Sequence, residues 1–440
     1  MRILHISHGC LPEMSGGVES YLQELIAEQR RVGDEIHLLA GSHDLRPATV
    51  IEPQEIAGET VHRLYRSDLY FDLWARSYHA AADREIEAFL RELAPDVVHV
   101  HQWIRMTSNL VEIAARLGIP AVVTAHDVYT SCPRAFRVRR DGEACYRRLS
   151  VESCLDCVPK FGHETDTELA FGIELFRDQY RNELERAAAV LVSDPATSDL
   201  LAETTDIEPD RFETLPLPYG RRFADLDVVP SSPTGDEPFR FAYWGVLTYR
   251  KGAQFMVRAF ADLCRRGLPR PAELHLFGGI DTHELEADLH ATADGLPVVF
   301  HGRYEYSQLA SAGIHMGIFP MLCFETWGFV LDECFELGIP CITTENGALA
   351  RRAGEAAIRV PPKDERALRD AMASVLADAR RHAALSAQIP ELPPTTDRHA
   401  AALRTVYERS VERGPRDVAR IPAARRAEWI ELQRESAIGR

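Results

Sequence analysis

The sequence predicts two doubly wound α/β domains. Short apolar stretches alternate with amphipathic helical stretches along both halves of the 440-residue chain. A proline-rich, polar stretch at residues 228–238 separates the halves and has the composition of an interdomain connector. The apolar stretches are continuous runs, which is typical of parallel sheets that helices cover on both faces. We therefore expect two domains that face each other across a cleft, with ligands bound at the carboxyl ends of the strands.

The first half opens with a βαβ unit. An apolar strand at residues 1–7 precedes a helix at residues 18–33, and the next strand follows at residues 35–40. The crossover between these strands is expected to be right-handed. The apolar face of the helix comprises Val18, Tyr21, Leu22, Leu25 and Ile26, and the helix is expected to end at Gly33. Later elements of this half are expected at residues 96–101, 111–118, 120–127 and 187–193.

The same alternation restarts after the connector. A helix is expected at residues 253–267 and another after Gly328. Strands are expected at residues 239–245, 273–279, 297–302, 314–320 and 340–344. The resulting organisation is a first domain at residues 1–228, a second domain at residues 238–395, and C-terminal helices at residues 396–440 that pack back toward the first domain.

The net charge and the lengths of the apolar runs limit the classes of function that the protein can have. The net charge of −17 excludes a duplex nucleic-acid binder, which needs cations to displace phosphate counterions. The first residues lack the uninterrupted apolar core of a signal peptide, and no apolar run approaches the roughly 20 residues of a membrane span. We therefore expect a cytoplasmic protein with small-molecule partners, without a membrane span; peripheral membrane contact and the oligomeric state stay open.

A pair of glycines, Gly16 and Gly17, follows the first expected strand. Glycines here let the backbone approach a ligand closely, and the N–H groups at a helix start favour an anion. The stretch equally suits an ordinary turn between a strand and a helix. It contains neither a GxGxxG fingerprint nor a Walker motif, so the sequence predicts neither a dinucleotide site nor a P-loop.

Lys251 is one of only three lysines in the chain. It lies between a strand that ends at Gly245 and a helix that begins after Gly252. A lysine beside a helix N-terminus suits a phosphate, although a lysine in an arbitrary position is usually a solvated surface residue.

Two acids, Glu325 and Glu333, lie eight positions apart around Gly328. With the helix beginning at Gly328, Glu325 falls in the loop before it and Glu333 within its first two turns. Carboxylates accept hydrogen bonds from hydroxyls and repel phosphate groups. The pair therefore suits a ligand with an anionic centre and hydroxylated ends, and a nucleotide sugar fits that description.

Six stretches together resemble the retaining glycosyltransferases of family 4, which have the GT-B architecture of two Rossmann-like domains. The resemblance covers nearly the whole chain in the family's order, and the pair of acids is its most specific part. The stretches are GGVES at 16–20, DVVHVH at 96–101, AHD at 125–127, GVLTYRKG at 245–252, FHG at 300–302 and ETWGFVLDE at 325–333.

The resemblance implies that the domain at residues 1–228 binds the acceptor and that the domain at residues 238–395 binds the nucleotide-sugar donor. It also implies roles for individual residues. Glu333 is expected to bind the ribose hydroxyls of the donor, and Glu325 the hydroxyls of the transferred sugar. The amides of Gly328 and Phe329 and the turn at residues 16–17 are expected to hold the diphosphate and the sugar. No metal is expected in catalysis, because a lysine and helix amides take its place.

The same resemblance gives Lys251, between Gly245 and Gly252, the task of stabilising the leaving diphosphate. His126 corresponds to a histidine of the family that lies near the anomeric carbon. A lone histidine is more often structural, but its place in the AHD stretch favours the active-site role.

The chain departs from the family at two places. An arginine that usually follows the first glycine of the lysine-bearing loop is replaced by Val246, so Arg250, Arg303 or backbone amides must take over its contact with the diphosphate. A second glycine motif of the family is degraded at residues 345–350. The acid pair Asp225 and Asp227 is interpreted as a surface turn rather than a metal site.

A segment at residues 132–158 is rich in cysteine and arginine. Its cysteines fit a structural zinc site in a reducing compartment, with reduced thiols or a redox pair as the alternatives. Its arginines suit an anionic acceptor or a lipid head-group, and equally a solvated loop. We expect acceptor specificity to reside here. The cysteines are Cys132, Cys145, Cys154 and Cys157, and the arginines are Arg134, Arg137, Arg139, Arg140, Arg147 and Arg148.

The expected function is transfer of a sugar from a nucleotide diphosphate sugar to a small-molecule acceptor, with retention at the anomeric carbon. The alternatives are a family relative that uses a sulfur or nitrogen nucleophile in natural-product biosynthesis, a nucleotide-sugar epimerase, and a sugar-nucleotide sensor. The scarcity of lysines disfavours a pyridoxal-phosphate phosphorylase. The arginine-rich composition indicates a bacterium with a G+C-rich genome. The donor base, the sugar and the acceptor stay open.

Overall fold

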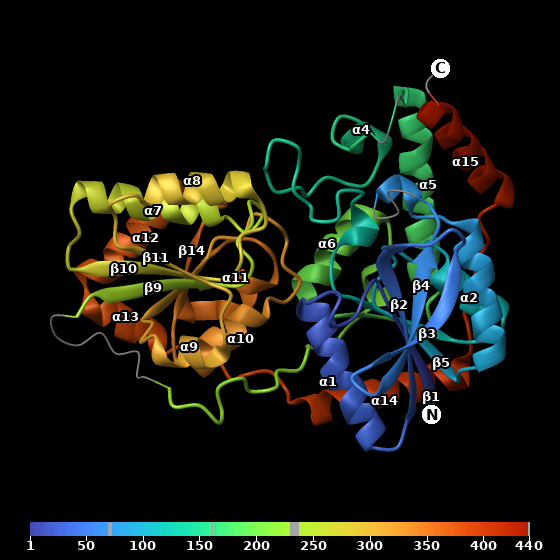
Figure 1. Ribbon diagram of the computed structural model, residues 1–440, viewed down its shortest axis with the longest axis horizontal. Helices are drawn as coiled ribbons and strands as arrows, with labels where there is room; N and C mark the ends of the chain where they lie inside the picture. Colours follow the sequence, from blue (N-terminus) through green and yellow to red (C-terminus); the bar gives the residue numbers. More distant parts are fainter. Residues whose placement is uncertain (69–72, 161, 163, 229–236, 439–440) are drawn as a thin grey trace. The chain divides into compact units, whose positions relative to one another are not determined.

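The computed structural model describes the whole chain except residues 69–72, 161, 163, 229–236 and 439–440 (Figure 1). The expected connector at 228–238 therefore lies almost wholly outside the described residues. The chain divides into two compact units. The first comprises Met1–Phe136, Tyr146–Pro218 and Thr396–Arg440, and the second comprises Arg137–Cys145 and Tyr219–Thr395.

The first unit is built on one eight-stranded sheet. Its strands are β1 (Arg2–Ser7), β2 (Glu35–Leu45), β3 (Val50–Ile56), β4 (Glu59–Arg66), β5 (Val97–Val100), β6 (Ala121–Ala125), β7 (Ala189–Val192) and β8 (Phe212–Thr214). Their order is β3-β4-β2-β1-β5-β6-β7-β8, and all neighbours pair in parallel except β3 and β4.

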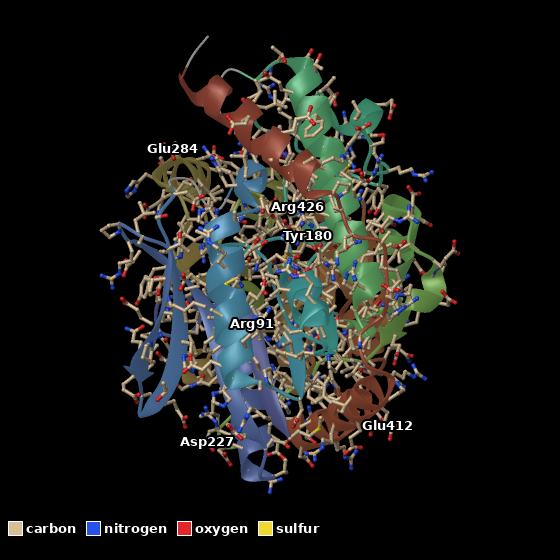
Figure 2. All side chains as sticks on the ribbon, turned by 90° about the vertical axis from the view of Figure 1, so that its right-hand side faces the viewer. Arg91, Tyr180, Asp227, Glu284, Glu412 and Arg426 are labelled. Atoms are coloured by element: carbon tan, nitrogen blue, oxygen red, sulfur yellow. The ribbon has the colours of Figure 1, made fainter. Side chains whose placement is uncertain are left out.

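Helices cover both faces of this sheet. They are α1 (Gly17–Arg31), α2 (Ala80–Leu93), α3 (Leu110–Arg116), α4 (Val151–Cys154), α5 (Asp166–Arg186), α6 (Pro195–Thr205), α14 (Thr396–Arg413) and α15 (Ala423–Ile438), with single 3₁₀ turns at Trp74–Arg76, Tyr129–Ser131 and Pro209–Arg211. Helix α14 packs against α1 and against strands β5 and β6, whereas α3 packs against α2 and α5. Arg426 of α15 donates a 2.8 Å hydrogen bond to Glu112, and Figure 2 labels Arg426 together with the buried Tyr180 of α5.

The antiparallel hairpin β3–β4 is absent from our sequence-based prediction. Strand β3 has the sequence VIEPQEI, with three acidic or amide side chains and a proline, and most of it is exposed. A proline and charges are typical of an edge strand, which has to resist pairing with other chains. The strand lacks the apolar run on which the prediction relied.

The second unit contains one six-stranded parallel sheet. Its strands are β9 (Phe239–Trp244), β10 (Ala272–Phe277), β11 (Val298–Gly302), β12 (Met316–Phe319), β13 (Cys341–Thr344) and β14 (Ala357–Val360). Its helices are α7 (Ala253–Arg266), α8 (His283–Ala293), α9 (Tyr306–Ser311), α10 (Phe329–Glu336), α11 (Gly347–Ala353), α12 (Glu365–Ala377) and α13 (Ala379–Ser386), with a 3₁₀ turn at Gly354–Ala356. Figure 1 shows α7, α8 and α12 on one face of the sheet and α9 and α10 on the other.

The strand order of the second sheet is β11-β10-β9-β12-β13-β14. Numbered within the unit, this is the order 3-2-1-4-5-6 of a doubly wound nucleotide-binding fold, and its direction reverses between β9 and β12. The core is formed by apolar residues from the other five strands, including the fully buried Phe241, Leu274, Ile318 and Ile342, and strand β11 packs partly buried side chains against it. The reversal point is where a doubly wound sheet binds its ligand.

Candidate active site

Lys251 and Glu325 follow the two strands that flank the reversal point of the second sheet. The loop after β9 carries Lys251, and the loop after β12 carries Glu325. The carbonyl oxygen of Arg250 accepts hydrogen bonds from the amides of Leu322 (2.8 Å) and Cys323 (3.2 Å). These bonds fix the two loops to each other.

Gly252 allows this close approach. Its φ of +76° lies in the left-handed region, and a β-carbon there would overlap the carbonyl oxygen of Pro320 in the neighbouring loop. Only glycine meets both conditions without strain. Gly252 is also the N-cap of α7, as the sequence predicted.

The charges of the two loops act on the same buried thiol. Cys323 Sγ lies 3.5 Å from Glu325 Oε1. Burial raises the pKa of Cys323 well above its usual value, the negative charge of Glu325 raises it further, and the positive charges of Lys251 and Arg250 oppose this rise. The loops therefore bring a lysine, an arginine and a carboxylate into one electrostatic environment.

Helix α10 begins where the sequence predicted. Gly328 is its N-cap with φ +76°, and Phe329 is its first residue. The first amides of this helix have no partner within it, which makes its N-terminus favourable for an anion. Glu325 lies in the loop before the helix and is partly exposed, whereas Glu333 lies on the helix and is buried.

Glu333 has two hydrogen-bond donors. Trp244 Nε1 donates to Oε2 at 2.7 Å, and the Tyr306 hydroxyl donates to Oε1 at 3.1 Å. Burial raises the pKa of Glu333 to about 7, although both hydrogen bonds lower it. A carboxylate has about four acceptor positions, so two remain for the hydroxyls of a ligand.

A buried ion pair holds the segment between the two acids. Asp332 pairs with Arg352, and it accepts a 3.0 Å hydrogen bond from Trp327 Nε1. Arg352 Cζ lies 3.4 Å from the centre of the Trp327 ring, and its Nη1 donates to the Trp327 carbonyl at 2.8 Å. These contacts fix the loop that carries Glu325 against α11.

Gly347 also positions Glu325, although the sequence analysis discounted its motif. It has φ +68°, and a β-carbon there would lie 2.5 Å from the Glu325 carbonyl oxygen and 2.9 Å from its nitrogen. The amide of Ala348 donates to that carbonyl at 2.8 Å. The glycine motif of the family is degraded here, yet Gly347 keeps a structural role that depends on its contact with Glu325.

The position of the missing arginine, Val246, and both candidate substitutes for it lie on the surface. Val246, Arg250 and Arg303 are exposed. The carbonyl of Val246 accepts a hydrogen bond from the Tyr243 hydroxyl at 2.9 Å, so its backbone is held in place. Gly245 before it has φ +111°.

In the first unit, Gly16 and Gly17 form the exposed N-terminus of α1, with Gly16 as the N-cap. Behind them, Glu19 is buried, and its Oε1 lies 3.3 Å from His8 Nε2. Burial raises the pKa of Glu19. Glu19 was not predicted as a site residue, although an acid in the first helical turn after paired glycines is visible in the sequence.

His126 follows β6, and His101 follows the neighbouring strand β5. His101 Nδ1 lies 2.9 Å from His126 Nε2. Burial, with smaller contributions from His399 and His8, lowers the pKa of His126 to about 3. His126 therefore stays neutral at physiological pH.

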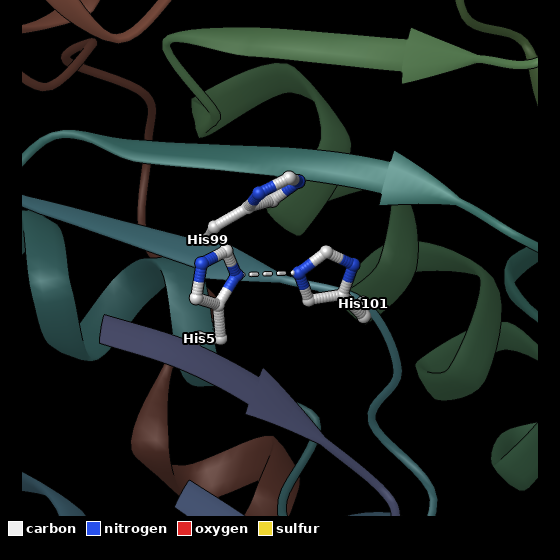
Figure 3. Close-up of side chains that lie close together, drawn as sticks. All are labelled: His5, His99 and His101. Carbon is white, nitrogen blue, oxygen red and sulfur yellow. Dashed lines mark hydrogen bonds between the residues drawn. The ribbon is translucent and has the colours of Figure 1, made fainter. Parts of the chain in front are cut away.

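His101 belongs to a buried cluster with His5 and His99 (Figure 3). His5 and His99 are paired across β1 and β5, so their side chains share one face of the sheet. That face is covered by α1 and α14, which supply Gln29 and Tyr407. This cluster was not predicted, although the alternation of histidine with valine in DVVHVH indicates two histidines on one face of a strand.

Two family models match this chain, and together they cover most of it. The model described as Glycosyltransferase Family 4 matches residues 15–219, and the model of Glycosyl transferases group 1 matches residues 238–378. The chain belongs to glycosyltransferase family 4. As a member of this family it is a glycosyltransferase enzyme.

A curated relative of this glycosyltransferase is D-rhamnosyltransferase WbpZ of Pseudomonas aeruginosa. The two are 26% identical over 393 residues, which are 84% of this chain and 86% of WbpZ. Solved structures with a similar fold include sucrose-phosphate synthase of Thermosynechococcus elongatus and Anabaena HepE in complex with UDP and glucose.

The structural similarity extends over whole chains. Sucrose-phosphate synthase has a TM-score of 0.60 and 17% identity, and the match covers 94% of this chain and 98% of that one. HepE has a TM-score of 0.57 and 14% identity, with coverage of 94% and 99%. The predicted GT-B fold, with two Rossmann-like domains, is confirmed.

The first unit of this glycosyltransferase contains a pocket of about 680 Å³. It lies between α1 and strands β2 to β4, and it opens beside the loop that follows β1. Its walls are largely apolar, with Glu19, Arg30 and Glu59 among them; the apolar side chains include Leu11, Leu22, Ile26, Leu38, Ile56 and Val61.

Several arginines of residues 132–158 form hydrogen bonds or ion pairs with other groups of the protein. Arg134 donates to the Cys157 carbonyl at 3.2 Å, and Arg147 donates to the Ser153 carbonyl at 3.1 Å. Arg148 forms an ion pair with Asp206. These bonds support irregular backbone and favour the interpretation of the segment as a structural loop.

The cysteines of this segment, all of which lie in the described part of the chain, form no disulfide bond. Among the described residues, three ligating atoms come within 4.8 Å of one another at His5, His99 and His101, and Cys132, Cys154 and Cys157 form no such group. Cys145 belongs to the second unit. The zinc site stays a prediction.

None of the helices in the described part of the chain combines the length and hydropathy needed to cross a bilayer. Asp225 and Asp227, expected to form a surface turn, are both exposed. Figure 2 labels Asp227.

Proposed function

We propose that this enzyme transfers a sugar from a nucleotide diphosphate sugar to a small-molecule acceptor, with retention at the anomeric carbon. One observation carries the proposal. At the reversal point of the second sheet, bonded loops place Lys251 and Glu325 in one environment, beside a helix N-terminus and the buried Glu333.

Each part of this arrangement suits one part of the donor. Glu333 accepts hydrogen bonds from the ribose hydroxyls, because Trp244 and Tyr306 hold its carboxylate and leave acceptor positions open. Glu325 accepts from the hydroxyls of the transferred sugar. Lys251 and the amides at the start of α10 stabilise the diphosphate as it leaves.

The proposed chemistry is a front-face substitution. The bond between the anomeric carbon and the diphosphate oxygen breaks, the acceptor oxygen attacks from the same face, and the leaving phosphate oxygen takes the acceptor proton. The enzyme then needs no strong base, which agrees with the low pKa of His126. Positive potential comes from Lys251 and helix amides, so we propose that the reaction is metal-independent.

We propose the pocket beside α1 as the place for the apolar part of the acceptor. It adjoins the loop between β1 and the Gly16-Gly17 turn, and its walls are largely apolar. Several arginines of residues 132–158 are engaged within the protein, which weakens the case for an anionic acceptor, one of the alternatives that the sequence left open.

The location that we propose is cytoplasmic. None of the nine cysteines, all of which lie among the described residues, forms a disulfide bond, and three of them, Cys323, Cys334 and Cys341, are buried in the second unit. Reduced thiols in this number are typical of a reducing compartment.

The decisive experiment is a thermal-shift panel of UDP, GDP, ADP and dTDP sugars, including a 6-deoxyhexose donor because a relative is a rhamnosyltransferase. A donor at 100 times its dissociation constant stabilises the folded protein by about 2.7 kcal/mol. The matching nucleoside diphosphate should stabilise less. A panel in which no sugar nucleotide shifts the melting temperature would contradict the proposal.

The donor so identified is then incubated with and without acceptors. NMR of the product distinguishes retention from inversion, and inversion would contradict the front-face reaction. A new sugar isomer formed from donor alone would indicate an epimerase. A product linked through sulfur or nitrogen would show the alternative nucleophile and retain the rest of the proposal.

A further inference from the structure

The histidine cluster of the first unit is one continuous hydrogen-bonded chain that ends at His126. Gln29 Oε1 lies 2.8 Å from His5 Nε2, and His5 Nδ1 lies 2.9 Å from His101 Nε2. His101 Nδ1 in turn lies 2.9 Å from His126 Nε2. Figure 3 shows the bond between His5 and His101. The chain runs from helix α1 through β1 and β5 to the carboxyl end of β6.

The cluster is not arranged as a metal site. Every ring nitrogen of His5 and His101 is already within hydrogen-bond distance of a partner in the chain. His99 is bonded at both nitrogens as well, to the Tyr407 hydroxyl at 2.6 Å and to Thr124 Oγ1 at 2.8 Å. A metal would have to displace these partners. The single lone pair of an imidazole nitrogen can either accept a hydrogen bond or coordinate a metal, and a protonated ring nitrogen can do neither.

The chain has a direction, because its first atom only accepts. With the carbonyl oxygen of Gln29 facing it, His5 Nε2 carries the proton, and neutral His5 then accepts at Nδ1. His101 must donate from Nε2 and accept at Nδ1. The same rule makes Nε2 the protonated nitrogen of His126 and Nδ1 its acceptor nitrogen.

The rule holds only while every ring is neutral. Burial lowers the pKa of His5 to about 4 and that of His101 well below its usual value. Both rings are buried, and the hydrogen bonds of the described residues join neither of them to a carboxylate. Because each neutral ring carries one proton, the orientation of the Gln29 amide determines which nitrogen is protonated in His5, in His101 and finally in His126.

A second series of hydrogen bonds starts at the same Gln29 side chain and restrains its orientation. The amide nitrogen of Gln29 points to the Tyr407 hydroxyl at 3.5 Å. If Tyr407 accepts there, it donates to His99 Nδ1, which lies 2.6 Å away. His99 then donates from Nε2 to Thr124 Oγ1. The orientation of Gln29 that protonates His5 at Nε2 thus satisfies both branches at once.

We propose that Gln29, His5 and His101 form a positioning relay that fixes His126 as the tautomer protonated at Nε2, so that Nδ1 accepts a hydrogen bond from a sugar hydroxyl. The inference rests on the proposed function, in which His126 lies near the transferred sugar. In this role His126 orients a hydroxyl and supplies no proton to the reaction.

The orientation of the His126 ring is restrained from another side. Tyr21 of α1 packs against it, with ring centres 4.9 Å apart. The Tyr21 hydroxyl lies 3.0 Å from His399 Nε2, and His399 Nδ1 lies 2.9 Å from the Pro216 carbonyl. Because that carbonyl only accepts, His399 is protonated at Nδ1 and Tyr21 donates to its Nε2. The tyrosine is therefore held by α14.

The first test is the tautomer itself. Protein labelled with ¹⁵N-histidine gives long-range proton–nitrogen correlations whose pattern distinguishes a ring protonated at Nε2 from one protonated at Nδ1. His126 is assigned by its loss in a His126→Ala variant. We expect the Nε2 tautomer for His126 in the full-length enzyme. A ring protonated at Nδ1 would overturn the relay.

The second test compares two changes at His101. Asparagine places an acceptor oxygen close to where Nδ1 lies, whereas leucine of similar size has no acceptor. We expect His101→Leu to allow both tautomers of His126 and to lower kcat at least about tenfold with KM for the donor nearly unchanged. His101→Asn should keep the Nε2 tautomer and recover most of kcat. Equal loss in both variants with an unchanged His126 tautomer would show a merely structural role and overturn the proposal.

Failure of the relay and failure of the proposed function give different results. The NMR experiment on unmodified enzyme needs no activity and tests the relay alone. A His126→Ala variant that keeps full transfer activity would remove the role of His126 in sugar binding, and with it the functional part of the proposal.

Discussion

Trp244, the last residue of β9, donates a 2.7 Å hydrogen bond from its indole to the buried carboxylate of Glu333 on α10. This bond joins the two elements that flank the reversal point of the second sheet. It sets the direction of the carboxylate before any ligand arrives, so the ribose site is pre-organised. The bond also lowers the pKa of Glu333, but burial has the larger effect and raises this pKa to about 7.

Donor binding should depend on pH through Glu333. The carboxylate is the better acceptor for ribose hydroxyls, and it is the minor form below pH 7. Affinity for the donor nucleotide should therefore rise roughly tenfold between pH 6 and pH 8 and then level off. Calorimetric titration across this range measures it.

Two variants control that experiment. Glu333→Gln should bind more weakly at every pH and lose the dependence. Trp244→Phe removes a bond that lowers the pKa, so its transition should move to higher pH. A pH dependence that persists in Glu333→Gln would assign it to another group.

The same carboxylate should affect folding stability with a definite sign. Its pKa in the folded protein lies above the ordinary value of 4.5, so the unfolded chain loses this proton first as pH rises. The ionised form is therefore penalised in the folded state, and the group lowers stability between about pH 4.5 and pH 7. Between pH 4.5 and pH 7, the melting temperature of the unmodified enzyme should fall more than the melting temperature of the Glu333→Gln variant. An identical decline in both proteins would show that the carboxylate is already ionised in the folded state.

Lys251→Ala should reduce transfer below about a tenth of the unmodified rate, because it removes the point charge that stabilises the leaving diphosphate. The measurement is release of the nucleoside diphosphate under saturating donor. Lys363→Ala is the matched control, since Lys363 forms an ion pair with Glu143 at 2.6 Å and is assigned no role in the site. Activity above a tenth in Lys251→Ala would sink the assignment.

Gly347→Ala should weaken donor binding and destabilise the fold by about 1–3 kcal/mol, since it adds a backbone clash to an unfavourable positive φ. The clash is with the backbone of Glu325, at 2.5 Å and 2.9 Å. Gly338→Ala is the control: Gly338 has φ +71° but nothing within 4 Å of its β-carbon position. If both variants lose the same stability and affinity, Gly347 does not position Glu325.

The zinc hypothesis predicts about one equivalent of metal in protein purified without a His-tag, and loss of that metal in a Cys154→Ser, Cys157→Ser double variant. Elemental analysis of both proteins measures it. Less than about a tenth of an equivalent in the unmodified protein would end the hypothesis.

Much of the second unit could be predicted from the sequence because its signals are local. The apolar runs, Gly252 before a helix, and Gly328 between two acids each act through their immediate neighbours in the chain. The effect of Gly347 was not predictable, because it depends on a contact with Glu325, 22 positions earlier. The partners of Glu333 were missed for the same reason, since Trp244 is 89 positions away.

The sequence by itself determined the two α/β domains, the helix starts at Gly252 and Gly328, and the family, because backbone propensities and short motifs are local properties. Only the tertiary structure showed that His5, His101 and His126 form one chain that begins at Gln29. Four strand and helix segments have to fold together before these polar groups meet. Burial then lowers the pKa of each ring and turns separate histidines into an ordered series of donors and acceptors.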